Sequence, residues 1–236
     1  MYGYHYGFYG FDWTYILLII GMLLSLAASA KLKSTFARYR RVRNASGLTG
    51  AEAAARILRA AGITDVQIRA IPGSLTDHYD PRTKTVSLSQ DIYGQTSLAA
   101  VGVAAHECGH AIQHAAHYVP LELRSAIVPA ANFGSTLSWP LFLIGLIAGI
   151  RPLITAGIVL FSLAVLFQLV TLPVEINASS RALRMLQSTG ILGTEETGGA
   201  RRVLTAAALT YVAALAASIL QLLRLLILAG GRRNDD

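Results

Sequence analysis

Four long apolar runs constrain this chain more than any other feature of its sequence. None of them contains a charged residue, and a helix needs roughly 20 apolar residues to cross the hydrocarbon core of a bilayer. With 53% hydrophobic and only 14% charged residues, the chain has too little charge to cover a soluble globule. The sequence therefore predicts a mainly α integral membrane protein. The runs are residues 13–30, 125–150, 152–174 and 203–223.

The basic residues predict how these runs are oriented. Residues 1–13 contain no Lys or Arg, whereas residues 31–43 contain six, and residues 175–202 are also basic. Because basic loops stay in the cytoplasm, we expect the N-terminus outside and residues 31–124 and 175–202 inside. The excess of seven positive charges is thus explained by the bilayer, and we expect no nucleic-acid partner.

The first and last runs leave two points open. Ala28-Ser29-Ala30 resembles a signal-peptidase site, but no basic residue precedes the first run, so a retained anchor is favoured. Residues 1–13 are expected to be an aromatic segment at the membrane interface. Arg232 and Arg233 would lie outside if residues 203–223 span fully, so this last helix is either a full or a partial span.

The polar part between the first two runs predicts a small α+β unit. We expect a helix ending near Gly62, strands over 66–71 and 84–89 that form a small sheet, and a helix over 96–115. Strand 84–89 either offers a free edge to an extended substrate or only covers the site. The chain then divides into an anchor (1–30), a cytoplasmic zincin-like unit (31–124), a transmembrane hairpin (125–174), a cytoplasmic helix (175–202) and a C-terminal hydrophobic helix with its tail (203–236).

Residues 103–117, VAAHECGHAIQHAAH, hold four of the six histidines. His106 and His110 lie four residues apart, so on a helix their imidazoles can reach one ion, as zinc requires. Glu107 is offset from this pair and can act on a zinc-bound water without ligating the metal, as in metallopeptidases. The single cysteine, Cys108, excludes a Cys-based zinc finger, and we expect it to be packed.

The neighbouring residues of this helix are expected to have other roles. His114 extends the stripe, but three ligands on one straight helix would all approach from one side, so we do not expect it to bind the metal. His117 is grouped with it as an interface or solvated histidine. Gly109 is expected to allow a neighbouring helix to approach closely.

A catalytic zinc site needs a third protein ligand, and no further histidine is well placed. Among the carboxylates, Glu52, Glu195 and Glu196 look like acids in the first turn of helices, and Glu122 approaches the second run. Glu175 follows the third run, where an acid is a functional candidate. Two crossings separate it from the histidine pair, so the chain returns Glu175 to the side that it left.

Four motifs carry a family resemblance: LTDHYDPRTKTVSLS, VAAHECGHAIQHA, LPVEINASSRAL and AAALTYVAAL. In these motifs the sequence resembles the YugP-like family of bacterial membrane zinc metallopeptidases, and more distantly the HtpX and CAAX prenyl protease group of membrane gluzincins. This resemblance implies that Glu175 is the third zinc ligand on a later helix. In the wider group an Asp four residues on orients a ligand histidine, a position taken here by Ser179, with Asn177 nearby.

The implied activity is that of a zinc endopeptidase in the bacterial cytoplasmic membrane, with one catalytic Zn²⁺ and Glu107 as general base. Its expected partners are a peptide or protein substrate and the lipid bilayer. His78, Arg181 and Arg184 are candidates for a further donor to the transition state. Two alternatives remain at this point: an idle zinc-binding scaffold, and a metal-handling membrane protein, for which the apolar runs hold almost no polar residues.

Overall fold

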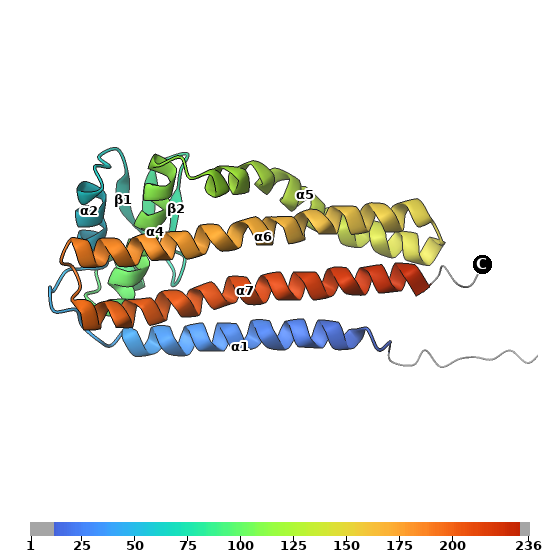
Figure 1. The fold of residues 1–236 in the computed structure, drawn as a ribbon, viewed down its shortest axis with the longest axis horizontal. Coiled ribbons are helices and arrows are strands. Elements are labelled where there is room, and N and C mark those ends of the chain that lie inside the picture. The colour runs from blue at the N-terminus through green and yellow to red at the C-terminus, as the bar shows by residue number, and fades with distance from the viewer. Residues whose placement is uncertain (1–11, 232–236) are drawn as a thin grey trace, which may run out of the picture.

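Long helices dominate the computed structural model, which describes residues 12–231 (Figure 1). Within that range, four helices are long and apolar enough to cross a bilayer. They lie side by side, and a compact α+β unit sits at one end of them. The helices are α1 (Tyr15–Tyr39), α5 (Val119–Ala148), α6 (Arg151–Ser188) and α7 (Thr194–Gly231), and the unit contains α2 (Gly50–Ala60), β1 (Gln67–Ile71), β2 (His78–Asp80), β3 (Thr85–Ser89), α3 (Gln90–Tyr93) and α4 (Leu98–Ala115).

The long helices form a layer in which α7 lies between α1 and α6, and α5 packs on α6. The tight turn between α5 and α6 lies at the end far from the α+β unit (Figure 1). Gly149 closes α5 in a left-handed conformation, and Pro152 lies in the first turn of α6, a pairing that suits the end of one helix and the start of the next. Large apolar side chains such as Leu23, Ile147 and Val159 are exposed on the outside of the layer, where lipid would cover them.

The helices run past the ends of the apolar runs. Helix α6 continues through residue 174, where we expected a boundary, and reaches Ser188, so that its 38 residues measure about 57 Å. Helix α1 likewise continues past residue 30 to Tyr39. Hydropathy marks where a helix would leave the bilayer, whereas the backbone hydrogen bonds continue through polar residues. Glu175 therefore lies within a helix rather than at its end.

The last apolar run is part of one continuous helix, α7, that packs along α1. Arg224, which directly follows the apolar run 203–223, is buried, and its Nε donates to Thr14 Oγ1 over 3.3 Å. Its guanidinium also lies 4.5 Å from the ring centre of Tyr15. Arg224 is thus held at the level where α1 begins. The predicted aromatic segment 1–13 falls mostly outside the described residues, as do Arg232 and Arg233.

The α+β unit is built around α4. Helix α2 begins with a capping box in which Thr49 and Glu52 satisfy each other's backbone amides, and its apolar face packs on α4. Gly62, with φ of +71°, follows the end of α2 as expected. Ser97 caps α4, its Oγ accepting a hydrogen bond from the amide of Ala100 over 3.1 Å. The expected helices of this segment are therefore confirmed.

The sheet has three strands in the order β1-β3-β2. Strand β3 pairs in parallel with β1 and antiparallel with β2. Two corrections follow. Residues 78–80, for which we predicted no strand, form a third strand. Strand β3 lies between two partners, so of the two alternatives for residues 84–89, the one in which this strand offers a free edge is contradicted. The edge strand next to α4 is β2.

Candidate metal centre

The site lies where α4 passes α6, and Gly109 sets the distance between them. A Cβ atom on this residue would collide with the backbone oxygen of Ala178, so only glycine allows the two backbones to approach this closely. The close approach expected at Gly109 is confirmed. It brings Glu175 and Ser179 of α6 beside the histidine pair of α4.

His106, His110 and Glu175 bring their ligand atoms to one point. Glu175 Oε2 lies 3.2 Å from His106 Nε2 and 3.6 Å from His110 Nε2, and the ligand atoms all lie within 4.8 Å of one another. Around a tetrahedral zinc with bonds of about 2.0–2.1 Å, neighbouring ligand atoms lie roughly 3.3 Å apart. The distances from the carboxylate to the two rings are close to this value, and two histidines with one carboxylate are a donor set that zinc accepts.

Gln113 determines which nitrogen of His110 faces the site. The Nε2 group of Gln113 donates to the backbone oxygen of Val174 (2.8 Å) and to Asn177 Oδ1 (3.0 Å). Its Oε1 therefore faces His110 Nδ1 at 3.0 Å and accepts a hydrogen bond from the protonated Nδ1. The other nitrogen of the neutral ring then points its lone pair at the site, which is the tautomer that a metal ligand requires.

A positive charge is needed between these groups. In the neutral ring, the lone pair of His110 would face the carboxylate of Glu175, and the two would repel. Burial lowers the pKa of His110, but its hydrogen bond to Glu175 and the charges of Glu107 and Glu175 outweigh burial and raise it overall. The carboxylates thus favour a cation at this position, and a divalent metal meets that demand while leaving the ring neutral.

Ser179 and Arg124 hold the remaining atoms of the ligands. Ser179 Oγ lies 3.1 Å from His106 Nδ1, in the position where the resemblance placed a group that orients the ring. Oε1 of Glu175 lies 3.4 Å from Arg124 Nη1, which leaves Oε2 of the same carboxylate for the metal. Each of the three ligands is therefore oriented by a polar partner outside the metal site.

Glu107 lines two neighbouring cavities, and His106 also lines both of them. One cavity, of about 300 Å³, is polar and is also lined by Arg124 and Tyr211. The other, of about 170 Å³, is bordered by apolar side chains of α1 and α7. Burial raises the pKa of the Glu107 carboxyl, although the charges of the two histidines oppose this shift. A carboxylate beside the ligand set, with space on both sides, is suited to proton transfer.

The chain is similar to a known protein family and to a known protein. Residues 14–230 match the model of the family described as "Putative neutral zinc metallopeptidase". The chain belongs to this family. It is also 49% identical over 223 residues to "Putative membrane protease YugP" of Bacillus subtilis (strain 168), an alignment that covers 94% of this chain and 99% of the relative. No solved structure matches the chain.

The zinc metallopeptidase family agrees with the donor set, since two histidines and one carboxylate are a common zinc site. The relative's name and the four apolar helices also associate the chain with a membrane. The family and the convergence of His106, His110 and Glu175 point to the same kind of site.

Three of the other carboxylates that were weighed have different partners. Glu52 caps α2, Glu122 lies 3.1 Å from His117, and Glu196 accepts a hydrogen bond from the amide of Ala45. His114 Nδ1 lies 2.8 Å from the hydroxyl of Tyr79. His114 and His117 are therefore outside the ligand cluster, as expected.

The residues named as candidate donors are spread over a wider area. His78 lines the polar cavity from β2, and its Nδ1 lies 2.9 Å from the backbone oxygen of Thr76. Arg181 Nε donates to Asn177 Oδ1 over 2.7 Å, so both residues support Gln113 rather than the cavity. Arg184 is exposed and lines neither cavity. Of the three candidate donors, only His78 borders the site.

The sequence interpretation missed Gln113, Arg124 and Tyr211. Gln113 could have been found, because it lies three residues after a ligand histidine on the same helix. Arg124 directly precedes the second apolar run, and its position there does not indicate which way α5 turns it. Tyr211 occurs in the motif AAALTYVAAL, but nothing in the sequence indicates that α7 turns it toward the site.

Proposed function

We propose that this chain is a membrane-embedded, zinc-dependent endopeptidase. The observation that carries the proposal is the convergence of His106, His110 and Glu175 on one point, at 3.2 and 3.6 Å between the carboxylate and the two rings. Glu107 lies beside that point, and a cavity of about 300 Å³ adjoins it. Ligands, a base and space for a peptide are the parts that metal-assisted hydrolysis needs.

Glu107 performs the proton transfers of the proposed reaction. A zinc ion held by the three ligands would act as a Lewis acid and lower the pKa of a water molecule toward neutrality. Glu107 accepts a proton from the attacking water and donates it to the amine that leaves when the peptide bond breaks. Its burial excludes bulk water, so the proton passes between Glu107 and the reacting groups.

Tyr211 and Arg124 are better placed than the earlier candidates to stabilise the negative oxygen of the transition state. Both line the polar cavity together with Glu107, and each offers a hydrogen-bond donor toward the same space. His78 borders the cavity from β2. Arg124 and Tyr211 both interact with Glu175, so we assign the donor role to the two residues together.

The substrate is proposed to enter as an extended chain along β2. This strand is at the edge of the sheet, and His78 and Tyr79 line the cavity, so a peptide could add its backbone to the free edge. The apolar cavity on the other side of Glu107, bordered by Phe36 and Val203, would then accept an apolar side chain next to the scissile bond.

The active site is proposed to face the cytoplasm of a bacterium, with the N-terminus outside. Support comes from the basic residues of 31–43 and 175–202, which flank the α+β unit and the ligand cluster, since such residues remain on the cytoplasmic side. The membrane concerned would be the bacterial cytoplasmic membrane, in keeping with the family resemblance.

Three glutamine variants test this function. Glu107→Gln keeps the ligands, so the purified protein should retain zinc while peptide cleavage falls by about 100-fold or more. Glu175→Gln should lose zinc, because a neutral amide replaces the anionic ligand. Glu122→Gln is the matched control, since its carboxylate pairs with His117 outside the cluster, and it should keep both properties. Bound zinc is measured by mass spectrometry on folded, detergent-purified protein, and cleavage is measured with peptide mixtures.

The alternatives give different outcomes. An idle scaffold would bind zinc without cleaving any peptide in the wild-type form. A metal-handling protein would move zinc across proteoliposomes, with a rate that depends on the three ligands and not on Glu107. Full cleavage by Glu107→Gln would refute the proposed mechanism, and retained zinc in Glu175→Gln would refute the ligand assignment.

A further inference from the structure

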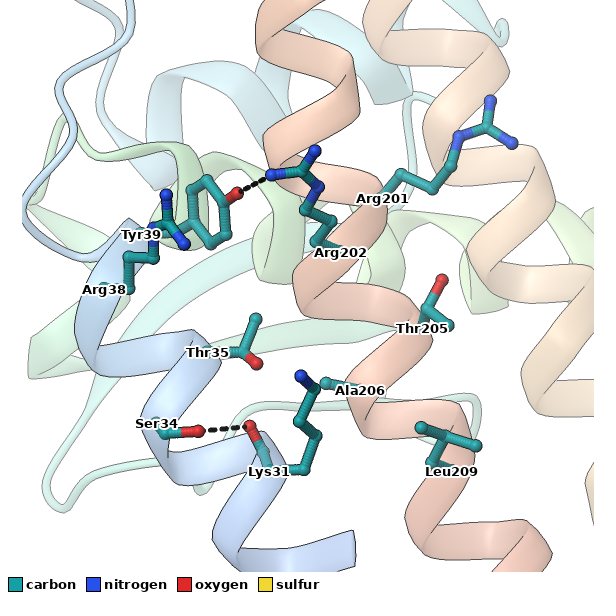
Figure 2. Close-up of a pocket in the computed structure, with 10 residues that line it drawn as sticks. All are labelled: Lys31, Ser34, Thr35, Arg38, Tyr39, Arg201, Arg202, Thr205, Ala206 and Leu209. Carbon is teal, nitrogen blue, oxygen red and sulfur yellow. Dashed lines mark hydrogen bonds between the residues drawn. The ribbon is translucent and has the colours of Figure 1, made fainter.

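A large groove lies between α1 and α7, away from the metal centre (Figure 2). Its volume is about 620 Å³, roughly twice that of the polar cavity at the site, which is about 300 Å³. Ten residues line it, and none of them is acidic. They are Lys31, Ser34, Thr35, Arg38, Tyr39, Arg201, Arg202, Thr205, Ala206 and Leu209.

Four cations surround this groove without a counter-charge. Within residues 12–231, no carboxylate lies within 4.0 Å of Lys31, Arg38, Arg201 or Arg202. Like charges that line one groove repel one another, and an anion bound between them would relieve that repulsion. The electrostatics of the groove therefore favour a negatively charged ligand.

Two of these cations are held in place by Tyr39. Arg202 Nη1 donates to the hydroxyl of Tyr39 over 2.9 Å, and the guanidinium carbon of Arg38 lies 5.6 Å from the centre of the same ring. Figure 2 shows Arg202 reaching from α7 toward α1 and Lys31 reaching from α1 toward α7, whereas Arg201 points away from α1. Donors that are already positioned lose little entropy when they bind an anion.

The groove lies where both helices change from charged to apolar. Lys31 is the first charged residue after the uncharged run of α1, and Arg202 is the last before the uncharged run of α7. Leu209 lies seven residues further along α7, about 10 Å deeper. If α1 and α7 cross a bilayer, this boundary is the level of the lipid headgroups.

We propose that this groove binds the phosphate of an anionic phospholipid headgroup. Lys31 and Arg202 would contact the phosphate, Thr35 would offer a hydroxyl group, and one acyl chain would follow α7 past Leu209. A free phosphate would gain the same ionic contacts but not the apolar wall. Basic pockets between transmembrane helices recognise lipid headgroups in this way.

The position of the groove gives the lipid a structural role. On α7, Arg202, Ala206 and Leu209 line the groove, whereas Val203 and Ala207 line the apolar cavity beside Glu107. At 100° per residue, Val203 and Ala207 lie roughly 110° around the helix from the three groove residues, so the two sets occupy neighbouring faces of α7. A headgroup bound to both α1 and α7 would therefore hold two helices that form the wall of that cavity.

Lipid binding by the full-length, detergent-purified protein tests the proposal. Native mass spectrometry is used to titrate phosphatidylglycerol and phosphatidylcholine with identical acyl chains, and we expect a clear preference for phosphatidylglycerol. Because one basic side chain near a charged lipid contributes about 1 kcal/mol, Lys31→Gln and Arg202→Gln should each weaken phosphatidylglycerol binding about fivefold. Arg202→Lys should retain most of the affinity, since it keeps the charge.

Lys33→Gln is the matched control. Lys33 is an exposed residue of the same helix at nearly the same depth, but it does not line the groove, so its loss should leave binding unchanged. Equal weakening by Lys33→Gln would show attraction by diffuse surface charge and would overturn the site. Equal affinity for the two lipids, or equal binding of inorganic phosphate alone, would overturn the assignment to a lipid headgroup. The measurement reports lipid binding, so it does not depend on peptidase activity.

Discussion

At the scale of single residues, the candidate centre depends on the groups behind its ligands. Glu175 is held by Arg124, His110 by Gln113 and His106 by Ser179. Hydrogen bonds of this kind fix the orientation of each ligand and the tautomer of each ring. Ser179 takes the place of the carboxylate that orients this histidine in the wider family group. A neutral hydroxyl raises the basicity of an imidazole less than a carboxylate does.

Replacing Ser179 with alanine tests this arrangement. We expect zinc affinity to fall by about 10-fold, since the loss of an outer partner typically costs 10–100-fold and the hydroxyl is a modest one. Affinity is measured by competition with a chromogenic zinc chelator. Ser188→Ala serves as the control, because Ser188 is an exposed serine near the end of the same helix. Unchanged affinity in Ser179→Ala would mean that this hydroxyl does not orient His106.

At the scale of the helices, the site requires α4 and α6 to cross in contact. Gly109 leaves no room for a side chain against Ala178, and a Cβ on Gly102, which lies earlier on the same helix, would lie 3.4 Å from the Cβ of Ala200 of α7. Helix α4 thus packs against two long helices through small residues, which let helix backbones approach closely. The side chains of the proposed metal ligands reach one another because the backbones of α4 and α6 lie in contact.

Gly109→Ala is predicted to separate these helices. The added methyl group meets a backbone oxygen that cannot rotate away, so we expect a loss of stability of about 1–3 kcal/mol and weaker zinc binding. Thermal unfolding in detergent and bound zinc are the measurements. In Gly198→Ala the new methyl group meets open space, and because alanine is a better helix former, this control should be neutral or slightly stabilising. Equal stability of the two variants would contradict the tight crossing.

At the scale of the whole molecule, the path of the chain brings distant segments together. Helix α5 leaves the α+β unit, and α6 returns to it after a turn at the far end (Figure 1), so Glu175 reaches the histidines of α4 despite the 65 residues that separate it from His110. The same path puts both basic segments, 31–43 and 175–202, at the end of the molecule that carries the α+β unit. A single orientation in the bilayer would then keep both basic segments on the cytoplasmic side.

Single cysteines test that orientation. In a Cys108→Ala background, cysteines at Ser34 and Ser188 should not react with an impermeant thiol reagent in intact cells, whereas a cysteine at Tyr4 should react. The reason is that basic segments remain in the cytoplasm. All three positions are labelled again after permeabilisation, which checks that each cysteine is accessible. Reaction at Ser34 and Ser188 but not at Tyr4 in intact cells would reverse the proposed orientation.

Local spacing and chain direction were readable from the sequence by itself. The four-residue interval between His106 and His110 places both rings on one helix face whatever the surroundings, and an even number of crossings returns Glu175 to their side. The long helices followed from apolar runs that water cannot accommodate. Each of these inferences depends only on the period of a helix or on the thickness of a bilayer.

The tertiary structure alone decided which other side chains meet the cluster. Arg124, Tyr211 and Gln113 reach it because of the rotation of α5 and α7 and the depth at which α4 crosses α6, quantities that depend on packing between elements far apart in the chain. The same holds for the short strand β2, which forms only because β3 offers it hydrogen-bond partners. Residues 78–80 lack a strand pattern of their own, so the edge that faces the site exists only in the folded chain.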